Sequence, residues 1–323
     1  MLDASILQQV TEIFRNLDSQ YTLSAHISTQ RSEGSQMREF LNDFATTSEN
    51  INIELNDVDG DTLMFDIHKN GTPTDISFRG IPNGHEFTSL LLAILNADDK
   101  GKNLPDEGIA RRISALQGDI NLQTYISLSC TNCPDVVQTL NIFALLNPNI
   151  HHEMIDGALF QSEVEAKGVQ AVPSVFVNGE LLHVGRGTLS ELLEKLEAKY
   201  SANSDSANDT STAIKRDFDV IVLGGGPAGA SAAIYSARKG LKVAIIAERI
   251  GGQVKETVGI ENLISIPYTT GSELADNLRT HLTHYPIELF ENRRIESTEL
   301  KKAVKEIKVK GGEVFSSPAV IIA

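Results

Sequence analysis

The stretch Ile126-Ser127-Leu128-Ser129-Cys130-Thr131-Asn132-Cys133-Pro134 carries the only two cysteines of a chain of 323 residues. It continues the alternating, strand-like segment 122–129 and opens an apolar helical pattern, so the cysteines lie where a strand passes into a helix. The N-terminus of a helix stabilises a thiolate through its unpaired N–H groups and its positive dipole end. We therefore predict that Cys130 is an attacking thiol and that Cys133, one turn later, is its resolving partner.

A Cys-x-x-Cys pair can also be half of a zinc site, which would need two further ligands. The only close pair of histidines is His151-His152, and we interpret it as a strand edge rather than as a ligand pair. Two cysteines so close together form too short a loop to stabilise a fold, and in a reducing cytosol this spacing is typical of redox chemistry. The sequence thus favours a redox-active dithiol and no metal site.

A weak internal repeat, with an offset of about 100 residues, surrounds the cysteines. Segment 21–28 (YTLSAHIS) corresponds to segment 122–129 (LQTYISLS), and both have the alternation of a strand. Each copy is predicted to run strand, helix, strand, then proline, strand and helix, which is the order of a thioredoxin-like fold. Thr29 takes the place of Cys130 in the first copy, so only the second copy is expected to be redox-active.

A proline marks the same point in both copies, as Thr72-Pro73 and as Val172-Pro173. Each pair is followed by a strand-like run, a glycine-containing turn and an amphipathic helix, predicted at 86–95 and 188–196. The second pair has the spacing of a cis-proline loop that faces the dithiol, where a backbone edge can pair with a substrate peptide. Pro173 is therefore a candidate site residue.

Small polar residues fill the segment 201–211 (SANSDSANDTS), which predicts a flexible tether. A βαβ unit follows, with strands predicted at 218–223 and 242–247 and an alanine-rich helix at 227–239. The tether should let the parts on either side move relative to each other.

The first strand–helix connection of this unit reads Gly224-Gly225-Gly226-Pro227-Ala228-Gly229, a G-x-G-x-x-G pattern, and Glu248 ends the next strand. Glycines let a pyrophosphate approach the helix N-terminus, and the carboxylate accepts hydrogen bonds from ribose hydroxyls. We predict a dinucleotide site, and a glycine turn in an unrelated α/β fold is the alternative. The glycines alone do not decide which dinucleotide is bound.

The charge balance bears on the partners of the protein, because 28 basic and 43 acidic residues leave a net charge of −15. Such a chain has no basic face for nucleic acid or for an anionic membrane. Segment 1–17 has the pattern of an amphipathic helix rather than of a secretion signal, and no apolar run reaches the ~18 residues of a membrane span. We expect a cytoplasmic protein without nucleic-acid or membrane partners.

The part after the tether resembles the thioredoxin reductase family of flavoproteins. The resemblance rests on the glycine motif and extends through Gly251-Gly252-Gln253 and Ile260-Glu261-Asn262. It implies that the glycine motif holds FAD. It also implies four flavin contacts, at Glu248, Gly252, Gln253 and Asn262.

As a whole, the chain resembles the flavin-dependent peroxiredoxin reductases of the alkyl hydroperoxide reductase family, which place a duplicated thioredoxin-like module ahead of a flavin domain. The signature segments are Ser129-Cys130, Asn132-Cys133-Pro134 and 84–90 (GHEFTSL). The resemblance implies an α/β chain with two tandem thioredoxin-like folds, a flexible linker and a partial Rossmann-like FAD-binding domain. The implied bounds are 1–118 for the fold without the cysteine pair, 119–200 for the fold with it, 201–216 for the linker and 217–323 for the N-terminal part of the FAD-binding domain.

The same resemblance implies an electron path. Cys130 and Cys133 would receive electrons from NADH, or from NADPH, through FAD and a second dithiol that this sequence does not contain. They would pass them to the disulfide of the peroxiredoxin subunit and so support hydroperoxide detoxification. Glu86 would serve the dithiol as an acid–base group, or it is only a first-turn acid that favours the helix dipole. A homodimer through the flavin domain is expected.

Members of that family continue well beyond the position of Ala323. The resemblance therefore implies a C-terminal truncation, an incomplete FAD site and a fragment that cannot turn over NADH alone. Two other functions stay open: a general disulfide reductase with thioredoxin- or glutaredoxin-type clients, and a redox-controlled docking module without turnover.

Overall fold

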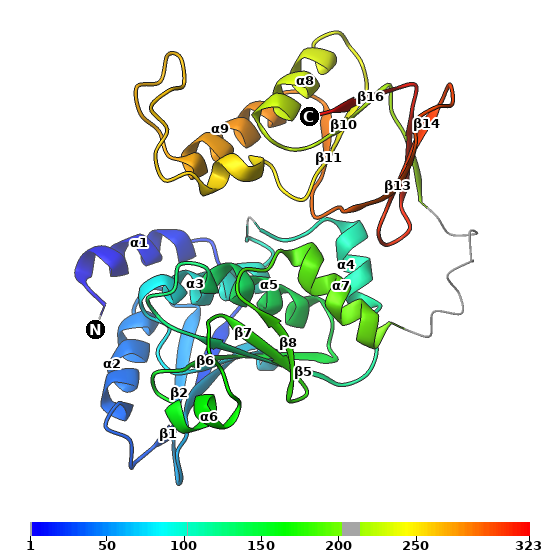
Figure 1. Ribbon diagram of the computed structural model, residues 1–323. Coiled ribbons are helices and arrows are strands. Elements are labelled where there is room, and N and C mark those ends of the chain that lie inside the picture. The colour runs from blue at the N-terminus through cyan, green and yellow to red at the C-terminus, as the bar shows by residue number, and fades with distance from the viewer. Residues whose placement is uncertain (1, 102, 202–213) are drawn as a thin grey trace. The chain divides into compact units, whose positions relative to one another are not determined.

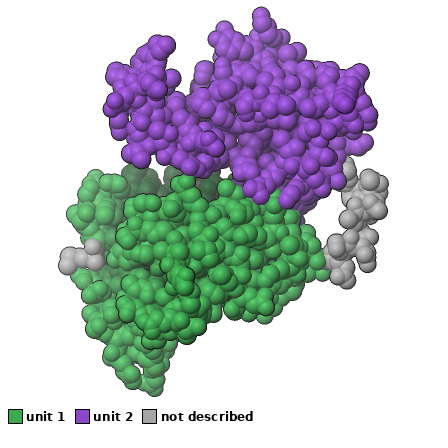
Figure 2. All heavy atoms as spheres, viewed as in Figure 1, with its two compact units in different colours: residues 1–104, 113–202 green, residues 105–112, 203–323 purple. Residues whose placement is uncertain are grey.

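The computed structural model describes residues 2–101, 103–201 and 214–323, which form two compact units (Figure 1). Residues 1–104 and 113–202 make up the first unit, and residues 105–112 and 203–323 make up the second (Figure 2). Most of the predicted linker, 202–213, lies outside the described residues.

A single eight-stranded sheet runs through the first unit in the order β2-β1-β3-β4-β6-β5-β7-β8. Its first four strands come from the first copy of the repeat and its last four from the second. The halves join where β4 and β6 pair in parallel, with Ile76 opposite His152. The two thioredoxin-like copies of the repeat therefore share one continuous sheet within the first unit, which the sequence repeat did not indicate. The strands are β1 (Tyr21–Ser28), β2 (Ile51–Val58), β3 (Leu63–Lys69), β4 (Thr72–Arg79), β5 (Ile120–Ile126), β6 (Ile150–Asp156), β7 (Ser174–Val177) and β8 (Glu180–Val184).

Helix α5 begins at Cys133, and Pro134 occupies its first turn, where an N–H would have no intrahelical partner. Strand β5 ends earlier than predicted because the chain turns after it, with Cys130 N donating to Ser127 O at 2.9 Å. None of the helices in the described ranges is long and apolar enough to cross a membrane. The helical elements up to residue 200 are α1 (Ala4–Phe14), α2 (Gly34–Ala45), the 3₁₀ helix η1 (Gly84–Glu86), α3 (Phe87–Ala97), α4 (Glu107–Ser114), α5 (Cys133–Leu146), α6 (Gln161–Ala166) and α7 (Leu189–Tyr200).

The core of the first unit follows from the alternation along its strands. On β3, Leu63, Phe65 and Ile67 are buried while the residues between them are partly exposed. Phe65 stacks on Phe78 of β4 with ring centroids 5.2 Å apart. Each buried side chain of this size contributes roughly 1.5–3 kcal/mol, so this core holds the strands that carry the site in a fixed register.

The second unit contains the βαβ element that the sequence predicts, formed by β10, α8 and β11. Strands β10 and β11 are buried throughout and pair in parallel, as expected of strands covered on both faces. Two sheets are present, with orders β12-β11-β10-β16 and β13-β14-β15-β9. The elements are β9 (Lys215–Asp217), β10 (Val220–Leu223), α8 (Pro227–Ala237), β11 (Val243–Ile246), η4 (Gly252–Glu256), α9 (Gly271–Thr283), β12 (Ile287–Phe290), β13 (Ile295–Glu299), β14 (Lys305–Val309), β15 (Val314–Ser317) and β16 (Ala319–Ile322).

Strand β9 lies at the end of the segment 201–216 that the sequence assigns to the linker. Its residues pair in parallel with β15, Lys215 opposite Val314. Among the described residues after 201, regular structure therefore begins at Lys215, slightly before the predicted bound at residue 217. The pairing that places Lys215 in a strand comes from β15, about 100 residues further along the chain, so local composition does not indicate it.

Candidate functional site

Cys130 and Cys133 form a disulfide whose Cα atoms lie 5.5 Å apart. Cys133 is fully buried at the start of α5, whereas Cys130 precedes the helix and is partly exposed. Once the pair is reduced, only the Cys130 sulfur can be approached by another protein. This asymmetry suits the predicted roles of attacking and resolving thiol.

A proline loop faces this pair. The Val172–Pro173 peptide bond is cis, and the Val172 carbonyl oxygen lies 3.8 Å from Cys130 Sγ. Pro173 is buried, and its carbonyl oxygen accepts a hydrogen bond from Gly185 N at 2.8 Å. Ala171 is exposed, so the chain just before the proline is open to a peptide that approaches Cys130.

Glu86 is the carboxyl group that the structure buries most completely near the dithiol, with 0% of the residue exposed. Ser89 Oγ donates to Glu86 Oε2 at 2.6 Å. Within the described part of the chain, Glu86 Oε1 has no hydrogen-bond partner. Burial raises the pKa of Glu86 from 4.5 to about 7; the Ser89 hydrogen bond opposes this rise and the charge of Asp135 adds to it.

The segment that carries Glu86 packs directly against the turn before Cys130. His85 N donates to the Leu128 carbonyl oxygen at 3.3 Å, and a Cβ on Gly84 would lie 2.7 Å from the same oxygen. Gly84 also has a φ of +56°, in the left-handed region that favours glycine. The first copy of the repeat therefore reaches the cysteine loop of the second copy through 84–86.

The first turn of α3, which follows this segment, contacts helix α5. Gln138 Nε2 of α5 donates to Thr88 Oγ1 at 3.3 Å and lies 3.5 Å from Ser89 Oγ, the hydroxyl group that binds Glu86. Although Glu86 is the residue before α3, its side chain makes no capping hydrogen bond to that helix. The Glu86 carboxyl is thus buried and makes no capping hydrogen bond to α3.

His151 and His152, the close pair of histidines, are not part of the site around the dithiol. Both are on β6, which pairs on each side, so the interpretation of His151-His152 as a strand edge is wrong. His152 is buried, with Nε2 2.8 Å from Thr124 Oγ1 and Nδ1 2.6 Å from Asn141 Oδ1, and burial lowers its pKa to about 3. The described residues contain no group of three or more histidine, cysteine, aspartate or glutamate side chains placed to bind a metal ion.

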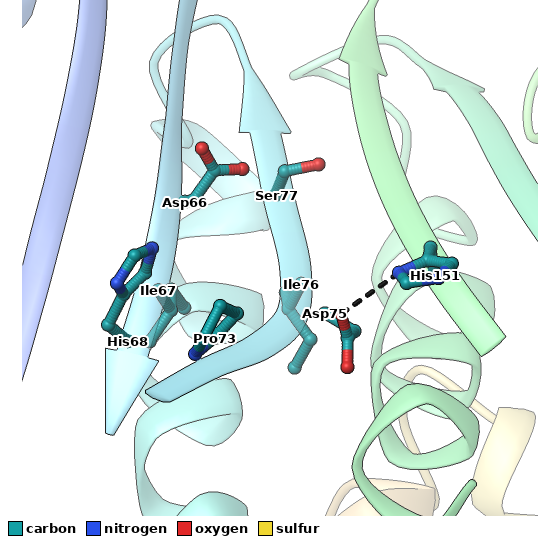
Figure 3. A pocket seen from close by; sticks show the side chains of 8 residues that line it. All are labelled: Asp66, Ile67, His68, Pro73, Asp75, Ile76, Ser77 and His151. Carbon is teal, nitrogen blue, oxygen red and sulfur yellow. Dashed lines mark ion pairs between the residues drawn. The ribbon is translucent and has the colours of Figure 1, made fainter. Parts of the chain in front are cut away.

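His151 faces the opposite side of the sheet, where its Nδ1 is 2.9 Å from Asp75 Oδ1. The two residues line a shallow pocket of about 310 Å³ between β3, β4 and β6 (Figure 3). The pocket contains neither cysteine nor Glu86, so it is separate from the dithiol. Its lining residues are Asp66, Ile67, His68, Pro73, Asp75, Ile76, Ser77 and His151.

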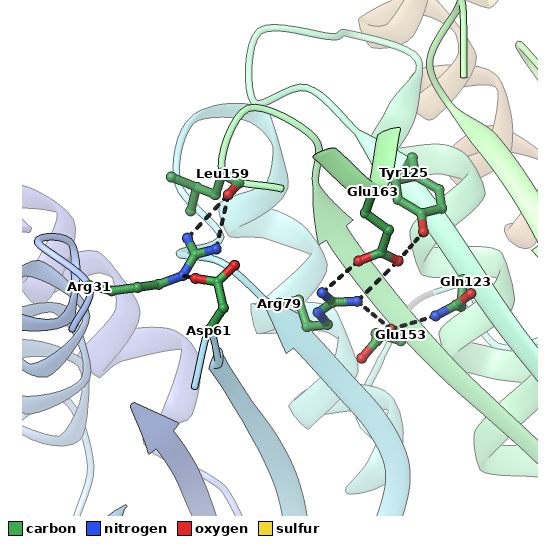
Figure 4. A network of polar contacts seen from close by, with 8 residues as sticks. All are labelled: Arg31, Asp61, Arg79, Gln123, Tyr125, Glu153, Leu159 and Glu163. Carbon is green, nitrogen blue, oxygen red and sulfur yellow. Dashed lines mark hydrogen bonds and ion pairs between the residues drawn. The ribbon is translucent and has the colours of Figure 1, made fainter. Parts of the chain in front are cut away.

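A network of charged groups, which the sequence did not indicate, joins the two copies of the repeat (Figure 4). Arg79 at the end of β4 donates to Glu163 Oε2 of α6 at 2.7 Å and to Glu153 Oε2 of β6 at 3.4 Å. Tyr125 of β5 donates to the other oxygen of Glu163. Helix α6 immediately precedes the proline loop, so the first copy helps to hold the chain that leads to the site.

Phe160 lies beside this network between two arginines of the first copy. The guanidinium carbons of Arg31 and Arg79 are 4.4 and 4.2 Å from its ring centroid. Arg31 Nη1 also donates to the Leu159 carbonyl oxygen at 3.1 Å. These cation–π contacts stabilise the position of Phe160, the residue directly before α6, where the two copies of the repeat meet.

In the second unit, the glycine motif connects β10 to α8 with no room for side chains at three of its positions. A Cβ on Gly224 would lie 2.1 Å from the Ala323 carbonyl oxygen. A Cβ on Gly225 would lie 2.4 Å from the Arg249 carbonyl oxygen, and one on Gly229 would lie 2.1 Å from the Gly224 carbonyl oxygen. A Cβ on Gly226 would meet nothing within 4 Å. Pro227 and Ala228 are exposed in the first turn of α8. This open cradle at a helix N-terminus fits a pyrophosphate.

The predicted flavin contacts lie in part around this cradle. A Cβ on Gly252 would be 3.2 Å from Gly226 Cα, so the turn that begins η4 lies against the glycine loop, and exposed Gln253 follows it. Glu248 is exposed after β11, as a ribose contact requires, and its Oε1 accepts from Arg294 Nε at 2.8 Å. Asn262 is exposed on a loop closed by pairing of Ile260 with Thr269.

Comparisons with known proteins match both the region that contains the cysteine pair and the region that contains the glycine motif. The thioredoxin domain family model matches residues 120–198, and the FAD dependent oxidoreductase model matches residues 219–306. The F subunit of alkyl hydroperoxide reductase from Pseudomonas putida is 39% identical over 325 residues, covering 100% of this chain and 61% of that protein. NADH dehydrogenase of Bacillus subtilis (strain 168) is 41% identical over 324 residues, again covering 100% of this chain and 61% of the relative.

Solved structures agree for the first unit. The NTD_N/C domain of the alkylhydroperoxide reductase AhpF from Enterococcus faecalis (V583) superposes with a TM-score of 0.57 at 29% identity, covering 61% of this chain and 100% of that chain. A protein disulfide oxidoreductase from Aeropyrum pernix K1 shares the fold, with a TM-score of 0.56 at 19% identity over 62% of this chain and 95% of that chain. The chain spans about three fifths of the length of the curated relatives that it matches.

Proposed function

Since this chain is homologous along its whole length to the F subunit of alkyl hydroperoxide reductase, we propose that it reduces the disulfide of a peroxiredoxin by thiol–disulfide exchange at Cys130 and Cys133. The observation that carries the proposal is the pairing of a partly exposed Cys130, beside the cis-proline loop, with a fully buried Cys133. Only one of the two sulfurs can meet a client, and the other is kept for the second step.

The exchange runs in two steps. The Cys130 thiolate attacks one sulfur of the client disulfide, so that a Cys130–client bond forms while the client S–S bond breaks and its other sulfur leaves as a thiolate. Cys133 then loses its proton and attacks the Cys130 sulfur, which restores the internal disulfide and releases the second client thiolate. Two electrons pass to the client, and the dithiol is oxidised.

Glu86 is the group we assign to the Cys133 proton. Its pKa of about 7 suits an acid–base catalyst at neutral pH, and its unpartnered Oε1 atom is available to accept a proton. Its segment packs on the turn before Cys130 and contacts α5, the helix that Cys133 begins. The first copy of the repeat would thus supply the acid–base group that the second copy lacks.

The electron supply rests on the second unit and on relatives longer than this chain. Gly224, Gly225, Gly226 and Gly229 would hold the pyrophosphate of FAD against α8, with Glu248 toward the ribose. Bound FAD would supply the exchange of two electrons between NADH, or NADPH, and a dithiol. Gly252 and Gln253 would border the flavin, and Asn262 is kept as a contact on resemblance alone. We further propose a homodimer formed through the flavin domain and a cytoplasmic location.

The test uses the 323-residue chain after chemical reduction and removal of the reductant. Mixed with oxidised peroxiredoxin, it should transfer one pair of electrons per chain, measured as newly formed client thiols. Cys130→Ser should abolish the transfer, and undiminished transfer by this variant would overturn the route. Oxidised thioredoxin and glutaredoxin, added in competition, distinguish a general disulfide reductase, and absence of transfer to any client would leave only a docking role.

A further inference from the structure

The loop Gly185–Gly187, between β8 and α7, lies beside the dithiol. Gly185 N donates to the carbonyl oxygen of Pro173 at 2.8 Å, so the loop is attached to the proline segment. From this loop, Arg186 Nε donates to Asn132 Oδ1 at 2.8 Å. Asn132 lies between the two cysteines and directly precedes Cys133, so this hydrogen bond reaches the cysteine loop itself.

The backbone of Arg186 is fixed by a buried histidine. His183 Nε2 lies 2.7 Å from the Arg186 carbonyl oxygen and 3.0 Å from that of Gly185, so this nitrogen carries the proton and donates. The other ring nitrogen, Nδ1, is 2.8 Å from Lys195 Nζ, which donates to it. A Cβ on Gly187 would lie 2.8 Å from His183 Nε2, so the histidine can hold the loop only because residue 187 is glycine.

The charges around the dithiol differ in sign and place. Glu86 and Asp135, from the α3 and α5 side, are acids that disfavour a thiolate when ionised. Arg186 is exposed and, through its hydrogen bond to Asn132, brings a positive charge to the cysteine loop. A cation next to a cysteine loop stabilises the thiolate relative to the thiol, and so stabilises the reduced pair relative to the disulfide.

We propose that Arg186 is a positioning residue of the dithiol: through Asn132 it fixes the loop between the cysteines, and its charge stabilises the Cys130 thiolate. The inference rests on the role of Cys130 as the attacking thiol in the proposed function. It concerns properties of the cysteine pair itself, so it can fail or hold whichever client the protein reduces.

The experiment compares the reduced 323-residue chain with Arg186→Gln and Arg186→Lys. The rate at which iodoacetamide alkylates Cys130 is followed against pH, with the modified cysteine identified by mass spectrometry. Because Arg186 is exposed and its field is partly screened, we expect Arg186→Gln to raise the Cys130 pKa by about half a unit, a loss of about threefold in rate at low pH. The equilibrium with glutathione should shift about threefold toward the disulfide.

Arg186→Lys keeps the positive charge and loses the planar donor. The Cys130 pKa of this variant should therefore lie close to that of the parent chain, while the contact with Asn132 is weakened. Lys199→Gln is the matched control: it removes one cation from the far end of α7, about 15 Å along that helix from its start beside the loop. The difference in Cys130 pKa between Arg186→Gln and the parent chain should become smaller in about 0.5 M salt, because salt screens the charge of Arg186. A purely structural effect would not depend on salt in this way.

Two results would overturn the proposal. One is an alkylation profile and a glutathione equilibrium of Arg186→Gln that match those of the parent chain. The other is an equal shift in Lys199→Gln, since this would mean that net charge alone, and not the place of Arg186, sets the thiol pKa. Among the described residues, Glu86 and Asp135 lie on the α3 and α5 side of the dithiol, and His183, Glu191 and Lys195 lie beside the Gly185–Gly187 loop. The profiles must therefore be compared over one pH range.

Discussion

Ser89 Oγ donates a 2.6 Å hydrogen bond to Oε2 of Glu86, where both side chains are buried and Glu86 Oε1 has no partner among the described residues. The bond favours the ionised carboxylate, and burial favours the protonated acid. The balance between them places the pKa of Glu86 at about 7, where a small change in either would alter its protonation at neutral pH.

Ser89→Ala should raise the pKa of Glu86 further, by about one unit, because it removes a hydrogen bond that stabilises the charged form. The measurement is the pH dependence of mixed-disulfide resolution by the reduced chain, read as the midpoint on the acid side. Thr88→Ala, which changes the exposed neighbouring hydroxyl, should leave that midpoint in place. A midpoint that falls or stays fixed in Ser89→Ala would contradict this account of Glu86.

Glu86 should also make the stability of the first unit depend on pH. Its pKa is 4.5 in the unfolded chain and about 7 when folded, so the folded state binds the proton more tightly. The contribution of Glu86 to stability is therefore fully present below pH 4.5 and is lost as the pH rises to about 7, by about 3 kcal/mol. The free energy of unfolding in urea, measured between about pH 4 and 8, should fall more steeply with rising pH in the parent chain than in Glu86→Gln, because buried His152 contributes the same opposing slope to both. Glu39→Gln, on the exposed face of α2, should keep the slope of the parent.

Cys133→Ser should trap the chain on its client. Cys130 remains exposed and can attack, but the buried resolving sulfur is gone, so the mixed disulfide accumulates. Non-reducing electrophoresis should show a covalent one-to-one complex with the peroxiredoxin that reductant dissolves. Cys130→Ser should give at least about tenfold less complex, and equal trapping by the two variants would reverse the assignment of the thiols.

Arg79→Met should destabilise the first unit by about 2 kcal/mol, because Glu153 and Glu163 lose their cation while they stay partly buried. Adding Glu163→Gln to Arg79→Met should recover part of that loss, since one of the two stranded charges is then absent. Urea unfolding followed by circular dichroism provides both values. Exposed Lys301→Met serves as a surface control in the second unit. Additive effects of the Arg79 and Glu163 changes would show that the ion pair contributes nothing.

Two alanine substitutions in the glycine motif should behave differently. Gly229→Ala places a Cβ 2.1 Å from a backbone oxygen and should destabilise the second unit by several kcal/mol. Gly226→Ala meets nothing within 4 Å, so the fold should persist while the methyl group fills the space left for a pyrophosphate. Thermal unfolding and FAD binding, measured by quenching of flavin fluorescence, separate the two effects. Unchanged FAD affinity in Gly226→Ala would argue against this cradle as the site.

Features set by neighbours along the chain could be predicted from the sequence. The helix that opens at Cys133, the cis Val172–Pro173 bond and the βαβ unit around Gly224–Gly229 all follow from local periodicity, proline spacing and glycine placement. These signals need no knowledge of distant contacts. The inference that the second copy, and not the first, carries the dithiol was equally local.

Only the tertiary structure could decide how distant segments meet. Strands β4 and β6 pair in parallel, and this pairing joins the two copies into one sheet. It depends on backbone hydrogen bonds, which cannot be predicted from the pattern of side chains along the chain. The burial of Glu86 likewise comes from chain packed around it rather than from its position in a helix turn. Arg186 and Asn132, 54 residues apart, lie at hydrogen-bonding distance because the sheet brings the end of β8 to the start of α5. Sequence thus determined which groups could do the chemistry, and the fold decided which of them share a site.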